Sequence, residues 1–140
     1  MLSTKEIGAT VRERFEAYQS GDAAKVMALY TDDVGYWDTS CAERIRGRAA
    51  VGKQVSELLG RYDLQFALLE EHRLEGRDAA IVLWEAAVRR RDGSQAPGRR
   101  LVMLRGMSIL EVKGDSICRD EAYIDLASLD RQFEEGNRPC

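Results

Sequence analysis

The second half of the sequence is divided into strand-like segments by short links that contain glycine. The segments lie near residues 64–74, 79–91, 99–112 and 116–124. The links between them are Glu75-Gly76-Arg77, Asp92-Gly93 and Lys113-Gly114-Asp115. Links of this kind join antiparallel neighbours. This half is therefore predicted to form an antiparallel meander of about four long strands, an ordinary size for a sheet. A parallel sheet or an all-helical structure would contradict the prediction.

The first half begins with the pattern of an amphipathic helix. Ser3-Thr4-Lys5-Glu6 matches a capping box, and apolar residues recur at steps of three and four between Ile7 and Tyr18. Gly21 can end this helix in a left-handed conformation, and Asp22 can cap a second helix.

The second helix is expected to stop at Thr31-Asp32-Asp33, where short polar side chains compete for the backbone amides. In the strand that follows, Val34, Tyr36 and Asp38 share one face, and Trp37 lies on the other. Because Val34 and Tyr36 must face the core, the same alternation is expected to point Asp38 into the interior.

A third helix is expected after Arg46-Gly47, and a short closing helix or turn around residues 126–133. Helices followed by a meander predict one α+β domain over residues 1–140. Three N-terminal helices then pack on one face of a curved antiparallel sheet.

Three stretches resemble a known family: GDAAKVMALYTDDVGYWD (21–38), IRGRAAV (45–51) and GDSICRDEAYIDLASLDRQF (114–133). They are similar to the nuclear transport factor 2-like superfamily, and most similar to its SnoaL-like polyketide cyclases. The resemblance implies a cone-shaped half-barrel with one deep, mostly apolar pocket. The superfamily includes isomerases, cyclases, dehydratases, epoxide hydrolases and non-catalytic binding or dimerising domains, so the fold alone does not give the function.

The resemblance to the ketosteroid-isomerase-like members places their general base at Asp38. It places their two oxyanion donors at Arg14 and near Gly106, so neither family donor is present. A base without donors aimed at the enolate lacks the largest usual contribution to such catalysis. Steroid-type isomerisation is therefore not expected.

Resemblance to the SnoaL-like cyclases implies that Asp125 acts as acid and base in an aldol-type ring closure, with Asp120 and Glu121 left open as alternatives. Resemblance to the epoxide hydrolases is weaker, because Arg105-Gly106-Met107 has their arginine without its partner carboxylate.

Each candidate aspartate also has a purely structural interpretation. Asp38 precedes Thr39-Ser40 and could hydrogen-bond its own turn, and Asp125 could cap the closing helix. Among the aromatic residues, the candidates for the ligand-binding wall are Tyr18, Trp37, Trp84 and Tyr123.

Charges inside the apolar strands allow one test of register. If Arg91 faces Arg99 across the hairpin, the same register puts Glu85 opposite Arg105. We expect a cross-strand ion pair there, on the outer face of the sheet. The single histidine, His72, is expected at an exposed strand end, and no metal site is expected.

The net charge and the distribution of apolar residues limit the kinds of partner that the protein is expected to bind. A net charge of −3 argues against a nucleic-acid partner. The absence of a signal-like or membrane-spanning apolar stretch predicts a cytoplasmic protein with no membrane partner. Apolar residues on both faces of 79–88 and 101–110 predict a homodimer through the outer sheet face.

Two hypotheses of function follow. The first is a small cofactor-independent enzyme that acts on a bulky, mostly apolar or polyketide-like metabolite, with aspartate moving a proton. The second is a non-catalytic ligand-binding or dimerising domain of the same fold.

Overall fold

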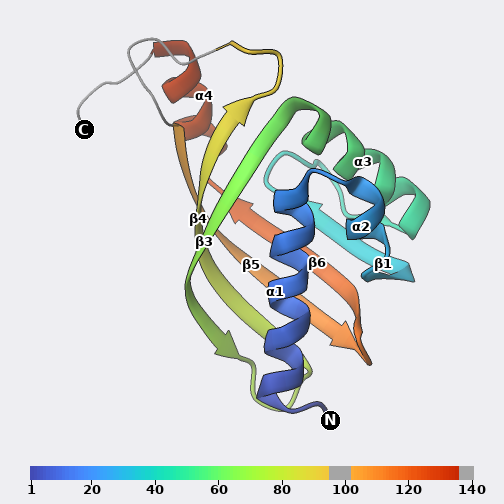
Figure 1. Cartoon of the computed structure of the whole chain (residues 1–140). Coiled ribbons are helices and arrows are strands. Elements are labelled where there is room, and N and C mark those ends of the chain that lie inside the picture. The colour runs from blue at the N-terminus through green and yellow to red at the C-terminus, as the bar shows by residue number, and fades with distance from the viewer. Residues whose placement is uncertain (95–101, 136–140) are drawn as a thin grey trace.

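Helices and strands divide the chain much as the sequence predicts (Figure 1). The computed structural model describes residues 1–94 and 102–135. In chain order the elements are α1 (Thr4–Ser20), α2 (Ala23–Met27), β1 (Tyr30–Asp38), β2 (Ile45–Arg46), α3 (Arg48–Arg61), β3 (Tyr62–Arg73), β4 (Ala79–Arg90), β5 (Val102–Lys113), β6 (Ser116–Ile124) and α4 (Leu126–Glu135).

The six strands form one curved sheet in the order β2-β1-β6-β5-β4-β3. The meander from β3 to β6 is antiparallel throughout, as predicted. The pairing of β1 with β6 is parallel, which the sequence did not indicate. It joins the first part of the chain to the last strand and brings Tyr36 and Asp38 beside Asp120 and Ala122.

Helices α1, α2 and α3 cover one face of the sheet, and α4 lies at the end of the sheet near β5 (Figure 1). The hydrophobic core fills the space between the helices and this inner face, with Val11 and Phe15 from α1, Val55 from α3, and Val82 and Leu110 from the sheet. The predicted α+β cone with three helices on a curved sheet is confirmed.

The capping predictions for α1 and α2 are confirmed. Ser3 and Glu6 form the reciprocal capping box, with the Glu6 amide donating to Ser3 Oγ over 3.1 Å. Gly21 adopts φ 77° at the end of α1, and the side chain of Asp22 accepts from the Ala24 amide.

The predicted end of the second helix at Thr31-Asp32-Asp33 is wrong. Helix α2 ends at Met27, and β1 already begins at Tyr30. The Leu29 carbonyl accepts a hydrogen bond from the Ile117 amide of β6 over 2.7 Å. Pairing with β6 therefore decides the conformation here, although the local sequence continues the helical pattern.

The register prediction in the long hairpin is confirmed where the structure describes it. Glu85 lies opposite Arg105, and the two side chains form an ion pair of 3.3 Å. Arg99 lies outside the described residues. His72 is exposed near the end of β3, as expected, and its ring bonds to Glu70.

Candidate functional site

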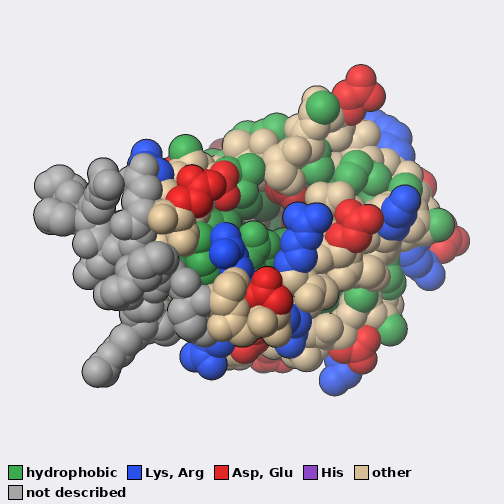
Figure 2. Space-filling model, turned by 90° about the horizontal axis from the view of Figure 1, so that it is seen from above, with side chains coloured by type: hydrophobic (Ala, Val, Ile, Leu, Met, Phe, Trp, Pro, Cys, Tyr) green, Lys and Arg blue, Asp and Glu red, His purple; other side chains and the backbone are tan. Residues whose placement is uncertain are grey.

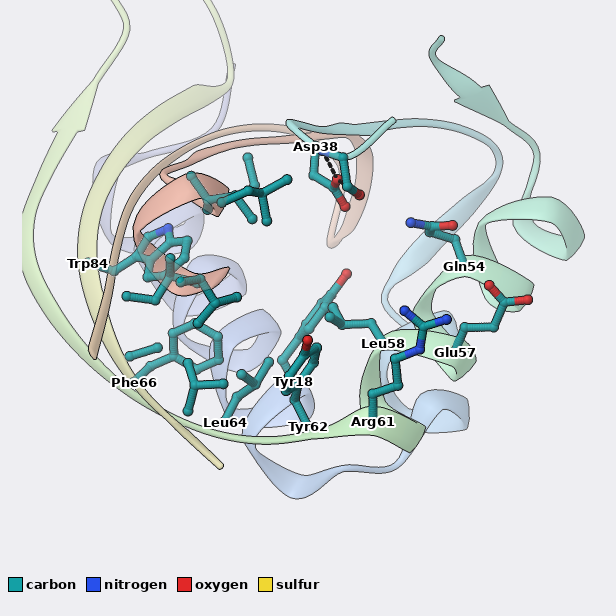
Figure 3. Close-up of a pocket in the computed structure, with 18 of the residues that line it drawn as sticks. Tyr18, Asp38, Gln54, Glu57, Leu58, Arg61, Tyr62, Leu64, Phe66 and Trp84 are labelled. Atoms are coloured by element: carbon teal, nitrogen blue, oxygen red, sulfur yellow. Dashed lines mark hydrogen bonds between the residues drawn. The ribbon is translucent and has the colours of Figure 1, made fainter. Parts of the chain in front are cut away.

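A cavity of about 330 Å³ lies between α1, α3, α4 and the inner face of the sheet. Figure 2 shows hydrophobic side chains inside a hollow whose rim carries acidic and basic groups. In the close-up of Figure 3, Trp84 and Phe66 lie on one side of the cavity, Asp38 at another, and Gln54, Glu57 and Arg61 on the α3 side. Most of the remaining wall is aliphatic: Leu58, Leu64, Ala86, Val88, Leu104, Ile124, Leu126 and Leu129.

Asp38 lies in the wall of this cavity with only 6% of its surface exposed. Its Oδ2 accepts from the Tyr36 hydroxyl over 2.6 Å, and its Oδ1 accepts from the Ser40 amide over 2.8 Å and from the Ser40 hydroxyl. Both sequence interpretations are therefore met at once. Asp38 faces the cavity, and it also fixes its own turn.

Tyr36 also lines the cavity, whereas the sequence predicts for it only a place in the core. Burial raises the pKa of Tyr36 well above its ordinary value, and the neighbouring Tyr18 and Asp38 raise it further. The phenol therefore keeps its proton and acts as a fixed donor to Asp38. The alternation of β1 could have identified it, because it shares a face with Asp38.

Arg14 also lines the cavity, although an arginine on α1 would be expected to face solvent. Its Nε donates to Asp120 Oδ2 over 2.9 Å and its Nη2 donates to Asp120 Oδ1 over 3.1 Å. Burial acts against the charge of Arg14, but the Asp120 carboxylate together with Tyr18 and Tyr30 outweighs it, so the pKa of Arg14 is raised. No short sequence pattern joins these residues, which lie 106 positions apart.

Two tyrosines extend this buried ion pair. The Tyr30 hydroxyl donates to Asp120 Oδ2, and the hydroxyls of Tyr18 and Tyr30 lie 2.8 Å apart. Since Tyr30 gives its proton to the carboxylate, Tyr18 is the donor in the second bond. Burial raises the pKa of both phenols, so both remain neutral donors. The prediction that Tyr18 lines the ligand-binding wall agrees with this position.

Trp84 lines the cavity as predicted, and Gly106 explains how it fits. A Cβ on Gly106 would lie 2.6 Å from Cη2 and 2.7 Å from Cε2 of the indole. The indole Nε1 donates to Ser108 Oγ over 3.0 Å, and the ring of Phe66 packs against it with centroids 5.3 Å apart. The Trp84 ring is therefore held in place as part of the cavity wall. It fills the space that a side chain at residue 106 would otherwise occupy.

The structure does not bring Asp125 into the cavity wall. Asp125 is exposed, and its Oδ1 accepts from the Ser128 amide at the start of α4. This is the helix-capping interpretation of the residue. Asp120 and Glu121, the two alternative candidates for the catalytic carboxylate, have different partners. Asp120 pairs with Arg14 on the inner face, and Glu121 pairs with Arg44 and Arg119.

The expectation that Trp37 and Tyr123 line the cavity is also not met among the described lining residues. Their rings pack against each other with centroids 5.2 Å apart, and Tyr123 is 43% exposed. The physical reason is strand alternation: Asp38 and Ala122 turn inward, so their neighbours Trp37 and Tyr123 turn outward. Arg105 is likewise on the outer face, so the epoxide-hydrolase motif does not reach the cavity.

Within the described residues, no group of His, Cys, Asp or Glu side chains could hold a metal ion. No described helix is long and apolar enough to cross a membrane.

The fold and cavity define a class: an α+β cone with a mostly apolar pocket and a single buried carboxylate, Asp38, in the described part of its wall. The sequence profile of the SnoaL-like domain matches residues 11–120, and the chain belongs to this family. None of the curated proteins matches the sequence.

Solved structures with the same fold carry several descriptions. A proposed isomerase from Bacillus subtilis is 15% identical, with a TM-score of 0.80 and 98% of each chain covered. A proposed polyketide cyclase from Xanthomonas campestris is 18% identical, with a TM-score of 0.78, over 93% of this chain and 98% of the other. An LEH-like epoxide hydrolase from M. tuberculosis is 20% identical, with a TM-score of 0.73, over 95% and 92%. At these identities the likeness establishes the fold.

Proposed function

We propose that the protein is a cofactor-independent enzyme that moves a proton on a compact, mostly apolar carbonyl metabolite, with Asp38 as the base. The observation that carries this proposal is the position of Asp38. It is the one carboxylate in the described cavity wall that is buried, while the other two, Glu57 and Asp130, are exposed.

In the proposed step, Asp38 takes a proton from a carbon next to a carbonyl group. The electron pair of the C–H bond moves into an enolate, and the protonated Asp38 returns the proton to the same or another carbon. Alternatively the enolate carbon attacks a second carbonyl group and closes a ring, and the alkoxide that forms takes the proton back from Asp38. Neither route needs an oxidant or a reductant. Tyr36 and Ser40 keep the carboxylate oriented during the transfer.

The cavity supports a compact ligand. Its volume of about 330 Å³ is near the lower end of the usual range for ligand pockets. Leucine, valine and aromatic side chains exclude water from the reacting carbon, which strengthens electrostatic interactions inside the cavity. The exposed Glu57 and Arg61 at the α3 side are suited to a polar substituent that stays near solvent.

Deuterium exchange tests the proposal without the natural substrate. The protein is incubated in D₂O with a β-keto ester, a cyclohexanone and a β,γ-unsaturated cyclic ketone, and proton NMR follows loss of the α-hydrogen signal. We expect faster exchange for at least one compound. Asp38→Asn should reduce the acceleration by about 100-fold or more, the usual scale of acid–base catalysis. Asp125→Asn should retain it.

Three results would contradict the proposal. The wild type could fail to accelerate exchange for every compound, Asp38→Asn could retain the acceleration, or Asp125→Asn could abolish it. The first result, combined with saturable binding of the same compounds, would favour the non-catalytic alternative. One observation favours that alternative: both oxygens of Asp38 already accept hydrogen bonds from the protein.

We also infer that two copies pair through the outer face of the sheet. Met103 and Tyr123 are exposed there, Leu83 and Met107 are half-buried, and the face also carries the Glu85–Arg105 pair. A patch with apolar groups and charges of both signs suits a second copy of itself, because a two-fold interface uses the same patch twice.

Sedimentation at micromolar concentration tests the pairing. A dimer is expected for the wild type, and a monomer for the outer-face variant Leu83→Lys. Ser56→Lys, on the exposed side of α3, is the control and should stay dimeric. A monomeric wild type would overturn the inference.

A further inference from the structure

Asp38 is a buried carboxylate without a positively charged partner. It is 6% exposed, and no lysine, arginine or histidine among the described residues forms an ion pair with it. Its hydrogen bonds come from uncharged groups: the Tyr36 hydroxyl, the Ser40 amide and hydroxyl, and the Cys41 thiol. These donors replace water around the carboxylate and leave its charge uncompensated. Because buried charges in proteins are usually paired, a positive group in the cavity would find its partner here.

The other charges of the described cavity wall do not supply that partner. Arg14 is already held by Asp120, which accepts from its Nε and Nη2 with both carboxylate oxygens. Arg61 is exposed at the α3 side, where water and salt screen its charge. Glu57 and Asp130 also line the cavity and are exposed, and their negative charges attract cations toward the opening. The described wall therefore carries a net negative charge.

Aromatic rings form much of the remaining wall of the cavity. They belong to Tyr18, Tyr36, Tyr62, Phe66 and Trp84. In Figure 3 the labelled rings lie around the same hollow as Asp38. The face of an aromatic ring attracts a cation, and the attraction is stronger where water is excluded. Rings and one carboxylate together offset the hydration that a cation loses when it enters an apolar cavity.

We propose that the cavity binds compact, apolar amines in their protonated form. The ammonium group lies against Asp38, and the hydrocarbon part lies against the aromatic and aliphatic wall. The inference goes beyond the proposed function, since it concerns binding alone and no bond is made or broken. An amine bound in this way occupies the proposed base and blocks proton transfer. A neutral ligand of the same shape buries the same apolar area but leaves Asp38 unpaired, so the site selects for positive charge.

A matched pair of ligands tests the inference by isothermal titration calorimetry. Cyclohexylmethylamine, like the lysine side chain, is protonated near pH 7, and cyclohexylmethanol has nearly the same shape without a charge. We expect the wild type to bind the amine about tenfold more tightly than the alcohol, the scale of one charge-assisted hydrogen bond. An amine that fails to bind, or that binds no more tightly than the alcohol, would overturn the inference. This comparison needs no substitution.

Replacing Asp38 isolates the contribution of its charge. Asp38→Asn keeps the shape of the side chain, so the preference for the amine should disappear while the affinity for the alcohol stays within about twofold. Asp125→Asn changes an exposed carboxylate outside the described wall and is the matched control, which should keep the preference. Equal losses of both ligands in Asp38→Asn would mean that Asp38 only shapes the cavity, and would overturn the inference. Loss of the preference in Asp125→Asn would overturn it as well.

The two proposals fail separately. Deuterium exchange that depends on Asp38, without a preference for the amine, would remove this inference and leave the proposed function standing. A preference for the amine that depends on Asp38, without exchange for any of the ketones, would establish an amine-binding site and remove the proposed proton transfer.

Discussion

The inner and outer faces of the sheet each carry one arginine–carboxylate pair, and the surroundings of the pairs differ. The side chains of Arg14 and Asp120 are 5% and 0% exposed, and their shortest N–O distance is 2.9 Å. The side chains of Arg105 and Glu85 are 79% and 28% exposed, with a distance of 3.3 Å. The inner pair also receives the Tyr30 hydroxyl and stacks on Tyr18.

The difference shows that burial, rather than the presence of an ion pair, decides what such a pair does. An exposed pair is worth about 0–1 kcal/mol, because water and salt screen it. Removing one partner of a buried pair leaves an isolated charge away from water, which costs about 3–5 kcal/mol. Of the two pairs, only the inner one reaches the cavity, and it does so through Arg14.

The largest effect is expected from breaking the inner pair on one side. Arg14→Gln leaves Asp120 without its cation and should lower the free energy of unfolding by about 3–5 kcal/mol. Urea unfolding followed by circular dichroism measures the loss. The double variant with Asp120→Asn should recover most of it. A single variant as stable as the wild type would contradict the assigned role of burial.

A smaller loss is expected where a glycine allows the inner face to pack. Gly106→Ala puts a Cβ within 2.7 Å of the Trp84 ring, whose indole N–H is held by Ser108. Overpacking of this kind should cost about 1–3 kcal/mol.

Gly60→Ala is the matched control, since nothing lies within 4 Å of a Cβ at that exposed position of α3. This change should be neutral or stabilising by up to about 1 kcal/mol. Gly106→Ala with unchanged stability would show that the Trp84 side chain can move, which would contradict its assignment as a fixed part of the cavity wall.

Alkaline pH should weaken the inner face through its tyrosines. Burial raises the pKa of Tyr18, Tyr30 and Tyr36 above the ordinary value of 10.0. Below pH 10.0 both the folded and the unfolded chain keep these protons, and the full stability is present. Above it the unfolded chain loses protons first, so the free energy of unfolding should fall as pH rises.

Tyrosinate absorbance, recorded with circular dichroism, checks the alkaline prediction. The three buried phenols should contribute to the absorbance only as the secondary structure is lost. Their ionisation near pH 10.0 in a protein that remains folded would contradict the hydrogen-bonded chain from Tyr18 to Asp120.

The smallest effect is expected from the same substitution on the outer face. In the monomeric Leu83→Lys background, where the outer face is open to water, Arg105→Gln should change the free energy of unfolding by less than about 1 kcal/mol. Urea unfolding under the conditions used for Arg14→Gln gives a direct comparison of the two pairs. A loss in this background as large as that of the inner variant would contradict the assigned role of burial.

The outer pair could be predicted from the sequence, and the inner pair could not. Glu85 and Arg105 lie in neighbouring strands of one hairpin, so a single register fixes their separation. Arg14 and Asp120 lie on α1 and β6, and they meet only because the helix crosses the inner face near that strand. The register of a hairpin can be worked out by counting residues from its turn, whereas the placement of a helix on a sheet depends on the packing of the whole core.

The residues of the candidate site also fall into those that the sequence predicts and those that it does not. Alternation along β1 correctly predicts that Asp38 points inward. The same alternation points Trp37 outward, against the expectation that Trp37 lines the cavity. For β6 the alternation could not be anchored, because its pairing register shifts near Glu111 and Val112. The sequence therefore leaves the directions of Asp120 and Glu121 open, and the choice of Asp125 depends on the family resemblance alone.

The sequence by itself determined the meander, the capping of α1 and the inward direction of Asp38, because each depends on residues close together in the chain. Tertiary structure decided that β1 pairs with β6, that α2 stops at Met27 and that Arg14 turns inward toward Asp120. Each of these depends on contacts between distant segments, whose free energy outweighs the local preference of a few residues. The cavity belongs to the second group, since its wall combines residues from three helices and the inner face of the sheet.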